Sequence, residues 1–312
     1  MEIPIKSELG DSKKILLCGA GGGYDIYSGI PLYFYLSALD KEVYLANYSF
    51  SAVQASQSQR IGPSGYIIDK NSRDLSYFPE KFLVDWMEEM GLPAQVFAFA
   101  KTGVKPLRES LQKIIEEKEI DTLILVDGGT DSLMQGNEAG LGTPTEDSTT
   151  IVAAHGIELE KKYLAAIGFG IDHFHGVCHA QFLENVADQI EFGGYKGCCS
   201  VRKEEMEGQY FLELVKYANQ RASHHMSIVA NSIASAIEGK FGDYHATNRT
   251  AGSRLFINPL MSLYWFFDLD KIARKLQYLS MIEHTKTESE VIENIRTFRK
   301  VIKHKAWEDL PY

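Results

Sequence analysis

Short apolar runs recur along the first half of the chain and alternate with amphipathic stretches. Six apolar runs rich in strand-forming residues predict strands at residues 14–18, 43–47, 66–68, 95–99, 122–126 and 163–169. Apolar positions at helical spacing predict helices over 28–39, 80–90 and 104–118, with Ser28 as the N-cap of the first. This alternation favours a Rossmann-like α/β fold, in which a mainly parallel sheet is flanked by helices.

The second half of the chain is predicted to be more helical. Helical spacing covers residues 179–190, 203–221, 226–238, 268–279 and 288–304, and short strands are expected at 193–201 and 254–257. The aromatic run at 258–267 is expected to be core or an oligomer contact. Since no linker rich in Pro or Ser divides the chain, we expect a single α/β domain, 1–312. Its sheet-forming half (1–175) would pack against a mostly helical half (176–312).

Composition narrows the class of protein. With 312 residues, 45% of them hydrophobic, the chain can bury a large core. The net charge of -10 does not favour binding to nucleic acid or to anionic membranes. No run approaches the roughly 18 apolar residues of a membrane span, and no apolar signal segment is recognised. We therefore expect a cytoplasmic protein with no nucleic-acid or membrane partner, and leave a homo-oligomer open.

The four cysteines do not form a C-x-x-C pattern, and two of them, Cys198 and Cys199, are adjacent in the chain. Adjacent cysteines are poorly placed to pair with each other, and a zinc ribbon needs paired C-x-x-C units. We therefore expect reduced thiols, most of them buried.

An acidic, glycine-rich loop follows the predicted strand at 122–126. Its carboxylates are Asp127, Asp131, Glu138, Glu146 and Asp147. Open α/β sheets build ligand sites at the carboxyl ends of their strands, and close carboxylates repel unless a cation or a shared proton offsets them. Carboxylate oxygens suit hard divalent cations. The loop therefore predicts a site for Mn²⁺ or Mg²⁺, with Ca²⁺ as a further candidate.

We expect Asp127 and Asp131 to hold the cation, because the strand fixes their position, and expect Asp25 and Glu138 to complete the set. Glu146 and Asp147 leave two interpretations open. They could close the site, or they could simply begin a helix, where acidic residues interact favourably with the helix dipole.

Three glycines, Gly21, Gly22 and Gly23, follow the first predicted strand and open the first helix. Their backbone amides can bind a phosphate or carboxylate. A dinucleotide fingerprint would need a further glycine at Tyr24, and no G-K-[ST] follows, so a P-loop is excluded. A nicotinamide or flavin cofactor is therefore a lesser alternative. The remaining interpretation is a tight turn in which Asp25 bonds only to backbone.

A histidine-rich segment at 168–179 follows the last predicted strand of the first half. Asp172, with His173 or His175, is a candidate acid/base pair that would move a proton on the substrate. A zinc site, or a loop whose histidines bond to backbone, remains open. His224 and His225 are expected to be structural.

Three further residues are candidates for binding the substrate. Asn47 and Ser49 follow the second predicted strand and would face the same crevice as the glycine loop. Arg249 lies in a polar loop and could bind an anionic substrate group.

Three motifs together resemble the domain of unknown function 1152 family. They lie at 21–32 (GGGYDIYSGIPL), 46–50 (ANYSF) and 127–147 (DGGTDSLMQGNEAGLGTPTED), and the resemblance spans most of the chain. That family implies no established activity. Residues 25–32 and 127–136 are also similar, in order and context, to loops of the D-glutamate cyclase family. That likeness implies a divalent cation and lyase chemistry on a small carboxylated substrate. Thr130 and Asp131 replace the Asn-Glu of that family, so the likeness supports the cation more than the reaction.

These observations predict a metal-dependent enzyme that acts on a small anionic metabolite, as a lyase, hydratase or hydrolase. The alternative is a Rossmann-like module that binds a nucleotide or metabolite without catalysis. A third hypothesis is a scaffold protein, in which the aromatic run at 259–267 would be exposed as a surface patch.

Overall fold

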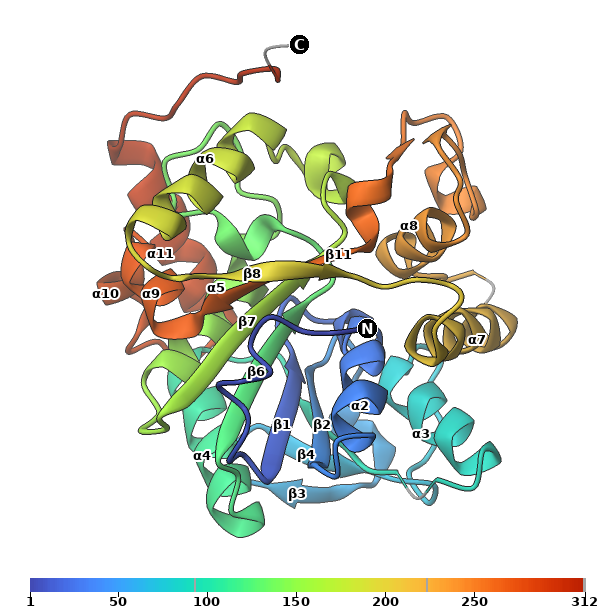
Figure 1. The fold of residues 1–312 in the computed structure, drawn as a ribbon. Coiled ribbons are helices and arrows are strands. Elements are labelled where there is room, and N and C mark those ends of the chain that lie inside the picture. Colours follow the sequence, from blue (N-terminus) through green and yellow to red (C-terminus); the bar gives the residue numbers. More distant parts are fainter. Residues whose placement is uncertain (93, 223, 311–312) are drawn as a thin grey trace.

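A nine-stranded mixed sheet forms the centre of the computed structural model, which describes residues 1–92, 94–222 and 224–310 (Figure 1). In spatial order its strands are β3 (Gln59–Ile61), β4 (Gly65–Ile68), β5 (Val96–Phe99), β2 (Glu42–Tyr48), β1 (Lys14–Gly19), β6 (Thr122–Asp127), β7 (Lys161–Ile167), β11 (Leu263–Asp268) and β8 (Tyr195–Ser200). The five central strands, from β5 to β7, are parallel, and antiparallel strands extend the sheet on both sides. The predicted α/β class is confirmed.

Helices cover both faces of the sheet (Figure 1). One face packs against α1 (Asp25–Ser28), α2 (Ile30–Ser37), α3 (Pro79–Glu89), α7 (Met206–Arg221) and α8 (Ile228–Ile237). The other packs against α4 (Val104–Lys118), α5 (Pro144–His155), α6 (His179–Glu191), α9 (Leu269–Lys275), α10 (Leu279–Ile282) and α11 (Glu288–Val301). Short 3₁₀ turns lie at η1 (Val53–Ser56), η2 (Asp131–Leu133), η3 (Ile171–His175), η4 (Asn248–Thr250) and η5 (Pro259–Ser262).

The two-residue period of a strand explains why apolar runs form the centre of this structure. In β1, Ile15 and Leu17 belong to the core on one face, and Leu16 and Cys18 belong to the core on the other. All four side chains are fully buried. Since successive strand residues point to opposite faces, a sheet covered on both sides needs continuous apolar runs rather than alternation.

The predicted strands of the first half are all present, and α4 has the predicted bounds. The predicted helix at 28–39 is divided into α1 and α2, and the N-cap of α2 is Gly29 rather than Ser28. Pro31 lies in the first turn of α2, where its missing N–H costs no helical hydrogen bond.

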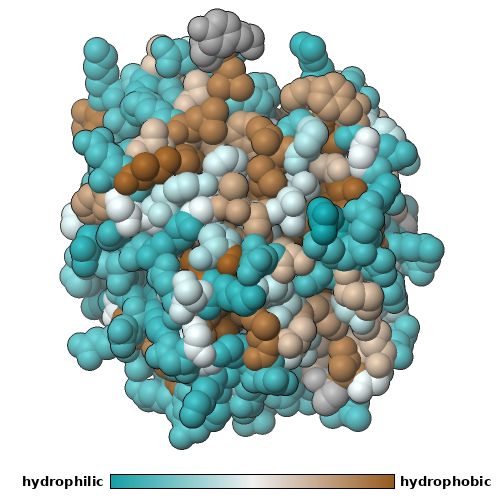
Figure 2. Space-filling model, viewed as in Figure 1, coloured by the Kyte–Doolittle hydropathy of each residue, from teal (hydrophilic) through white to brown (hydrophobic). Residues whose placement is uncertain are grey.

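The C-terminal half, predicted to be mostly helical, also supplies β8 and β11 to the same sheet. A separate two-stranded sheet pairs β9 (Gly242–Asp243) with β10 (Phe256–Ile257). The aromatic run forms β11, in which Tyr264, Phe266 and Phe267 are fully buried. The run is therefore core, and the patch that a scaffold would need is not formed there. The face shown in Figure 2 is mostly hydrophilic, with hydrophobic residues in scattered groups.

The order of the parallel strands sets the position of the site. From β1 the chain builds the sheet first toward β2 and β5, and then toward β6 and β7 on the other side. The loops that leave the carboxyl ends of β1 and β6 therefore diverge, and ligands bind at such switch points in open α/β sheets.

All four cysteines are free thiols, and Cys18 and Cys178 are buried. The expected burial therefore holds for two of the four, because Cys199 is half-buried and Cys198 is exposed. Among the residues that the structure describes, no helix combines the length and apolar character needed to cross a bilayer.

Candidate metal centre

A cleft of about 340 Å³ lies at this switch point. The loops after β1, β6 and β7 line it, together with the first turn of α5 and the segment that joins α7 to α8. Residues far apart in the sequence therefore meet at one edge of the sheet.

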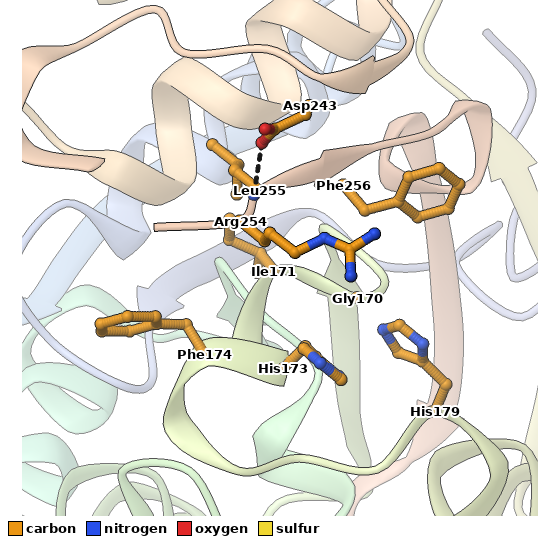
Figure 3. Close-up of a pocket in the computed structure, with 9 residues that line it drawn as sticks. All are labelled: Gly170, Ile171, His173, Phe174, His179, Asp243, Arg254, Leu255 and Phe256. Carbon is orange, nitrogen blue, oxygen red and sulfur yellow. Dashed lines mark hydrogen bonds between the residues drawn. The ribbon is translucent and has the colours of Figure 1, made fainter. Parts of the chain in front are cut away.

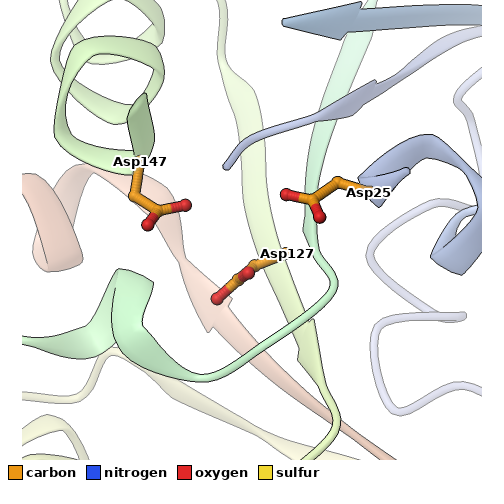
Figure 4. Close-up of side chains that lie close together, drawn as sticks. All are labelled: Asp25, Asp127 and Asp147. Atoms are coloured by element: carbon orange, nitrogen blue, oxygen red, sulfur yellow. The ribbon is translucent and has the colours of Figure 1, made fainter. Parts of the chain in front are cut away.

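Five aspartates from these segments line the cleft. They are Asp25 at the start of α1, Asp127 at the end of β6, Asp131 in η2, Asp147 in the first turn of α5 and Asp172 in η3. One carboxylate oxygen from each of Asp25, Asp127 and Asp147 lies within 4.8 Å of the others. Figure 4 shows these three side chains pointing toward one another from separate elements.

Four of the aspartates are held in place by donors from the loops around them. In each case one carboxylate oxygen, Oδ2, accepts the bond. The backbone donors are Gly21 N to Asp25 (2.6 Å), Ser132 N to Asp127 (3.3 Å), Thr143 N to Asp131 (2.7 Å) and Thr130 N to Asp172 (2.7 Å). The hydroxyl groups of Ser132 and Thr143 donate to the same oxygens as their own amides. The aspartates are thus held in fixed orientations by the loops around them.

Asp147 differs from the other four. Its side chain is 2% exposed, and both of its carboxylate oxygens are buried without a hydrogen-bond partner among the described residues. Leaving a buried polar atom unpaired costs about 1–3 kcal/mol, and more when the group is charged. Such a group in a folded protein implies a partner that is not part of the chain, or a bound proton.

Burial and mutual repulsion raise the pKa values of the cluster. Burial, and then the charge of Asp131, raise the pKa of Asp127 to about 8. Burial, followed by the charges of neighbouring aspartates, holds the pKa of Asp25, Asp147 and Asp172 well above the usual range. Burial also raises the pKa of Asp131, although two hydrogen bonds from Thr143 oppose this shift. Without a cation, the cluster therefore retains protons at neutral pH.

The donor set fits a hard divalent cation. All the candidate ligand atoms are carboxylate oxygens, which Mg²⁺, Mn²⁺ and Ca²⁺ prefer over nitrogen or sulfur. Ligands on opposite sides of such an ion are separated by about 4–5 Å, twice the metal–oxygen distance. The oxygens of Asp25, Asp127 and Asp147 all lie within 4.8 Å of one another, close enough for a single ion to contact all three.

Gly21 keeps the space between two of these aspartates open. A Cβ atom on Gly21 would lie 2.5 Å from Oδ1 of Asp147 and 2.7 Å from Oδ2 of Asp25. Any larger residue would displace a carboxylate, so the first glycine of the loop is required by the cluster itself.

The structure resolves the two interpretations of Glu146 and Asp147. Both lie in the first turn of α5, as the helix-start interpretation predicts. Only Asp147 lines the cleft, whereas Glu146 faces Lys101, with an Oε1–Nζ distance of 3.4 Å. Asp147 is the cluster member that the set of predicted ligands omitted.

Glu138, predicted as a cation ligand, does not line the cleft. Its buried carboxylate accepts hydrogen bonds from Gln135 N (2.8 Å), Gly136 N (2.8 Å) and Asn185 Nδ2 (2.7 Å). The prediction is corrected on this point: Glu138 ties its own loop to α6 and has no free face toward the aspartates.

Asn47 and Ser49 also lie behind the cleft rather than in it. The amide of Asn47 donates to Gly23 O (2.8 Å) and to Oε1 of the fully buried Glu80 (2.7 Å). Ser49 Oγ accepts from Ser51 N at 3.0 Å. These two residues therefore support the glycine loop and its neighbours instead of facing a ligand. Glu80 lies in a helix of ordinary amphipathic pattern, so the sequence alone offers no signal for it.

The histidine-rich segment divides between two places. Asp172 and His175 line the cleft, whereas His173 lines a neighbouring pocket. The glycines Gly21, Gly22 and Gly23 and the predicted anion-binding residue Arg249 line the cleft as expected.

His225 and Tyr77 are among the cleft residues that sequence reasoning misses or misjudges. His225, expected to be structural, lines the cleft, and its ring lies 6.0 Å from that of Tyr77, which also lines it. Tyr77 follows no motif, so only the fold identifies it.

Comparison with known proteins places the chain in a family. A family described as "Protein of unknown function (DUF1152)" matches residues 16–301, which is nearly the whole chain. The chain belongs to this family. No curated protein and no solved structure gives a significant match.

Proposed function

We propose that this protein is a divalent-cation-dependent enzyme that acts on a small anionic metabolite, by lyase, hydratase or hydrolase chemistry. One observation carries the proposal: Asp147 is buried with both oxygens unpartnered, close to Asp25 and Asp127. A purely structural carboxylate would have acquired donors during folding, as Glu138 has.

Asp25, Asp127 and Asp147 are the residues that would hold the cation, which we expect to be Mn²⁺ or Mg²⁺. A cation bound there would polarise a carbonyl or phosphoryl oxygen, or lower the pKa of a bound water. Asp131 is held by Thr143 in the same cleft and adds negative charge that favours a cation.

Other cleft residues would bind and orient the substrate. The Gly21 amide donates to Asp25, so the anion-binding role proposed for this loop falls to the amides of Gly22 and Gly23. Arg249 lines the cleft and places a positive charge there. The cleft therefore offers a cation-binding part and an anion-binding part, as a small anionic substrate would require.

Asp172 and His175 are the proposed proton-transfer residues. Burial, followed by the charges of Asp131 and Asp127, raises the pKa of Asp172 well above its usual range. A raised pKa favours the protonated form of Asp172, from which a proton can be delivered to a leaving group. His175 lies in the same 3₁₀ turn and lines the same cleft, so it can supply a new proton to Asp172 after the transfer.

Titration calorimetry with Mn²⁺ tests the cation site. We expect wild-type protein to bind Mn²⁺, and Asp127→Ala or Asp127→Asn to weaken binding at least 100-fold. Asp121→Asn is the matched control, because Asp121 caps the opposite end of the sheet by accepting from Lys13 N at 2.6 Å. Unchanged Mn²⁺ affinity in the Asp127 variants would show that this assignment is wrong.

A thermal-stability screen separates the enzyme from a binding module without catalysis. Ligands that bind the folded state raise the melting temperature by mass action. The screen uses nucleotides, sugar phosphates and amino acids, each with and without Mn²⁺. Shifts that require Mn²⁺ favour the proposal, whereas metal-independent shifts by nucleotides alone favour the binding module.

A further inference from the structure

A second pocket, of about 230 Å³, lies next to the cleft. Residues of η3, the start of α6 and the β9–β10 sheet line it. Its polar side chains include Arg254, His173 and His179. Figure 3 shows the Arg254 side chain extending toward the two histidine rings.

One histidine nitrogen in this pocket is left unpaired by the fold. Nε2 of His179 is buried and has no hydrogen-bond partner in the described part of the chain. The His173 ring is stacked on the His179 ring, with 5.0 Å between their centroids. His179 is also the first residue of α6, a helix of 13 residues, so the pocket lies at the positive end of a helix dipole.

One carboxylate, Asp243, also lines the pocket, but its Oδ1 atom already accepts a hydrogen bond within the fold. Asp243 Oδ1 accepts from Leu255 N at 2.9 Å (Figure 3) and lies 3.1 Å from Nε2 of His245. Asp243 thus fixes the backbone of Leu255, the residue that follows Arg254.

A small hollow of about 60 Å³ lies between the pocket and the cleft. It shares Phe174 and Arg254 with the pocket, and Asp172, His175 and Arg249 with the cleft. The hollow therefore adjoins both the Arg254 pocket and the aspartate cleft, and we refer to these three neighbouring cavities together as the groove.

We propose that the Arg254 pocket is a subsite for an oxyanion, a carboxylate or a phosphate, at the distal end of the substrate. This inference rests on the proposed function, because it assigns the other end of the substrate to the cation at the aspartate cluster. Arginine binds such groups through two parallel N–H donors, and the histidine rings add further N–H donors. At the other end of the groove, negative charge on the aspartates works against Arg249 and the glycine amides in binding an anion, whereas Arg254 lies away from that cluster.

Calorimetry with inorganic phosphate in EDTA tests the subsite, since chelation removes any contribution of a cation. We expect wild-type protein to bind phosphate and Arg254→Gln to lose at least tenfold in affinity. Arg254 is exposed, so the substitution should not affect folding, which circular dichroism checks. Arg202→Gln is the matched control, because Arg202 is also exposed and pairs with Glu205 at 2.7 Å. A parallel titration with succinate shows whether the distal group is a phosphate or a carboxylate.

The Asp127→Asn variant separates failure of this inference from failure of the proposed function. Phosphate binding in EDTA that depends on Arg254 and survives Asp127→Asn supports the subsite. If the wild-type protein binds phosphate through Arg254 but binds no Mn²⁺, the subsite is supported and the proposed function is overturned. Phosphate binding that requires Mn²⁺ and survives Arg254→Gln overturns the subsite and leaves the cation site standing. Absence of binding by both phosphate and succinate at millimolar concentration overturns the subsite as well.

Discussion

Glu138 and Asp147 are two buried carboxylates in the segment that follows β6, and their surroundings are opposite. Three N–H donors surround the Glu138 carboxylate at 2.7–2.8 Å. The Asp147 carboxylate has no donor among the described residues and lies close to Asp25 and Asp127. From the sequence both residues are simply acids in a glycine-rich segment.

The hydrogen-bond donors around a buried carboxylate, rather than its place in an acidic motif, therefore indicate whether it stabilises its loop or is available to a ligand. A carboxylate whose lone pairs are filled by backbone amides stabilises a loop. A buried carboxylate that is left unpaired destabilises the folded state. Such a carboxylate persists only if a bound ligand or proton offsets that cost. Matched amide substitutions at the two positions should therefore have opposite effects.

The largest effect is expected for Glu138→Gln. The new NH₂ group must face N–H donors of Gln135, Gly136 and Asn185, so at least one buried donor is left unpaired. We expect the free energy of unfolding to fall by about 3 kcal/mol, measured by urea denaturation in EDTA. Affinity for Mn²⁺ per folded molecule should remain unchanged. A stable Glu138→Gln variant that has lost Mn²⁺ binding would erase the distinction between the two carboxylates.

A smaller effect is expected from pH, because the raised pKa of Asp127 lies near neutrality. The pKa of Asp127 is raised to about 8 in the folded protein, against about 3.9 in an unfolded chain. Between these values the folded state holds a proton that the unfolded state has released, so stability falls as pH rises. One such carboxyl lowers the free energy of unfolding by about 1.4 kcal/mol for each pH unit of increase over this range.

Melting temperatures in EDTA should therefore decrease from pH 6 to pH 8, and Asp127→Asn should flatten this decrease. Added Mn²⁺ should restore stability most strongly at pH 8, where protons no longer compete for the ligands. Stability in EDTA that rises with pH over this interval would contradict the raised pKa values.

The smallest change in stability, but opposite in sign to that of Glu138→Gln, is expected for Asp147→Asn. The substitution replaces a carboxyl group that the folded protein must either keep protonated or hold as a negative charge among other aspartates. In EDTA we expect the variant to be more stable than wild type by about 1 kcal/mol, while Mn²⁺ affinity falls sharply. A destabilised variant with intact Mn²⁺ binding would place Asp147 in the same class as Glu138.

The sequence predicted the central part of the fold well because the relevant signals are local. The apolar runs that became β1 and β6 are short and unbroken, as strands buried on both faces must be. β11 was not recognised as a strand, because an aromatic run fits a strand or a buried helix equally well. Its place between β7 and β8 depends on pairing across long sequence separations.

The candidate site was predicted only where a local sequence signal marks it. Asp127 was identified because a strand ends there, and Asp25 because a glycine loop opens a helix at that position. Asp147 was left ambiguous, since a helix start explains an acidic residue without a ligand. Glu138 was assigned to the site only because it shares the acidic loop. Whether that loop folds toward the cleft or toward α6 depends on tertiary contacts with Asn185 that no local pattern encodes.

The most direct test of the cation site is a crystal structure of the protein soaked with Mn²⁺, with the ion located by its anomalous scattering. The account predicts a peak about 2.1–2.4 Å from carboxylate oxygens of Asp25, Asp127 and Asp147 at the carboxyl ends of β1 and β6. A cleft with no peak, and with these three carboxylates hydrogen-bonded to one another through shared protons, would contradict it.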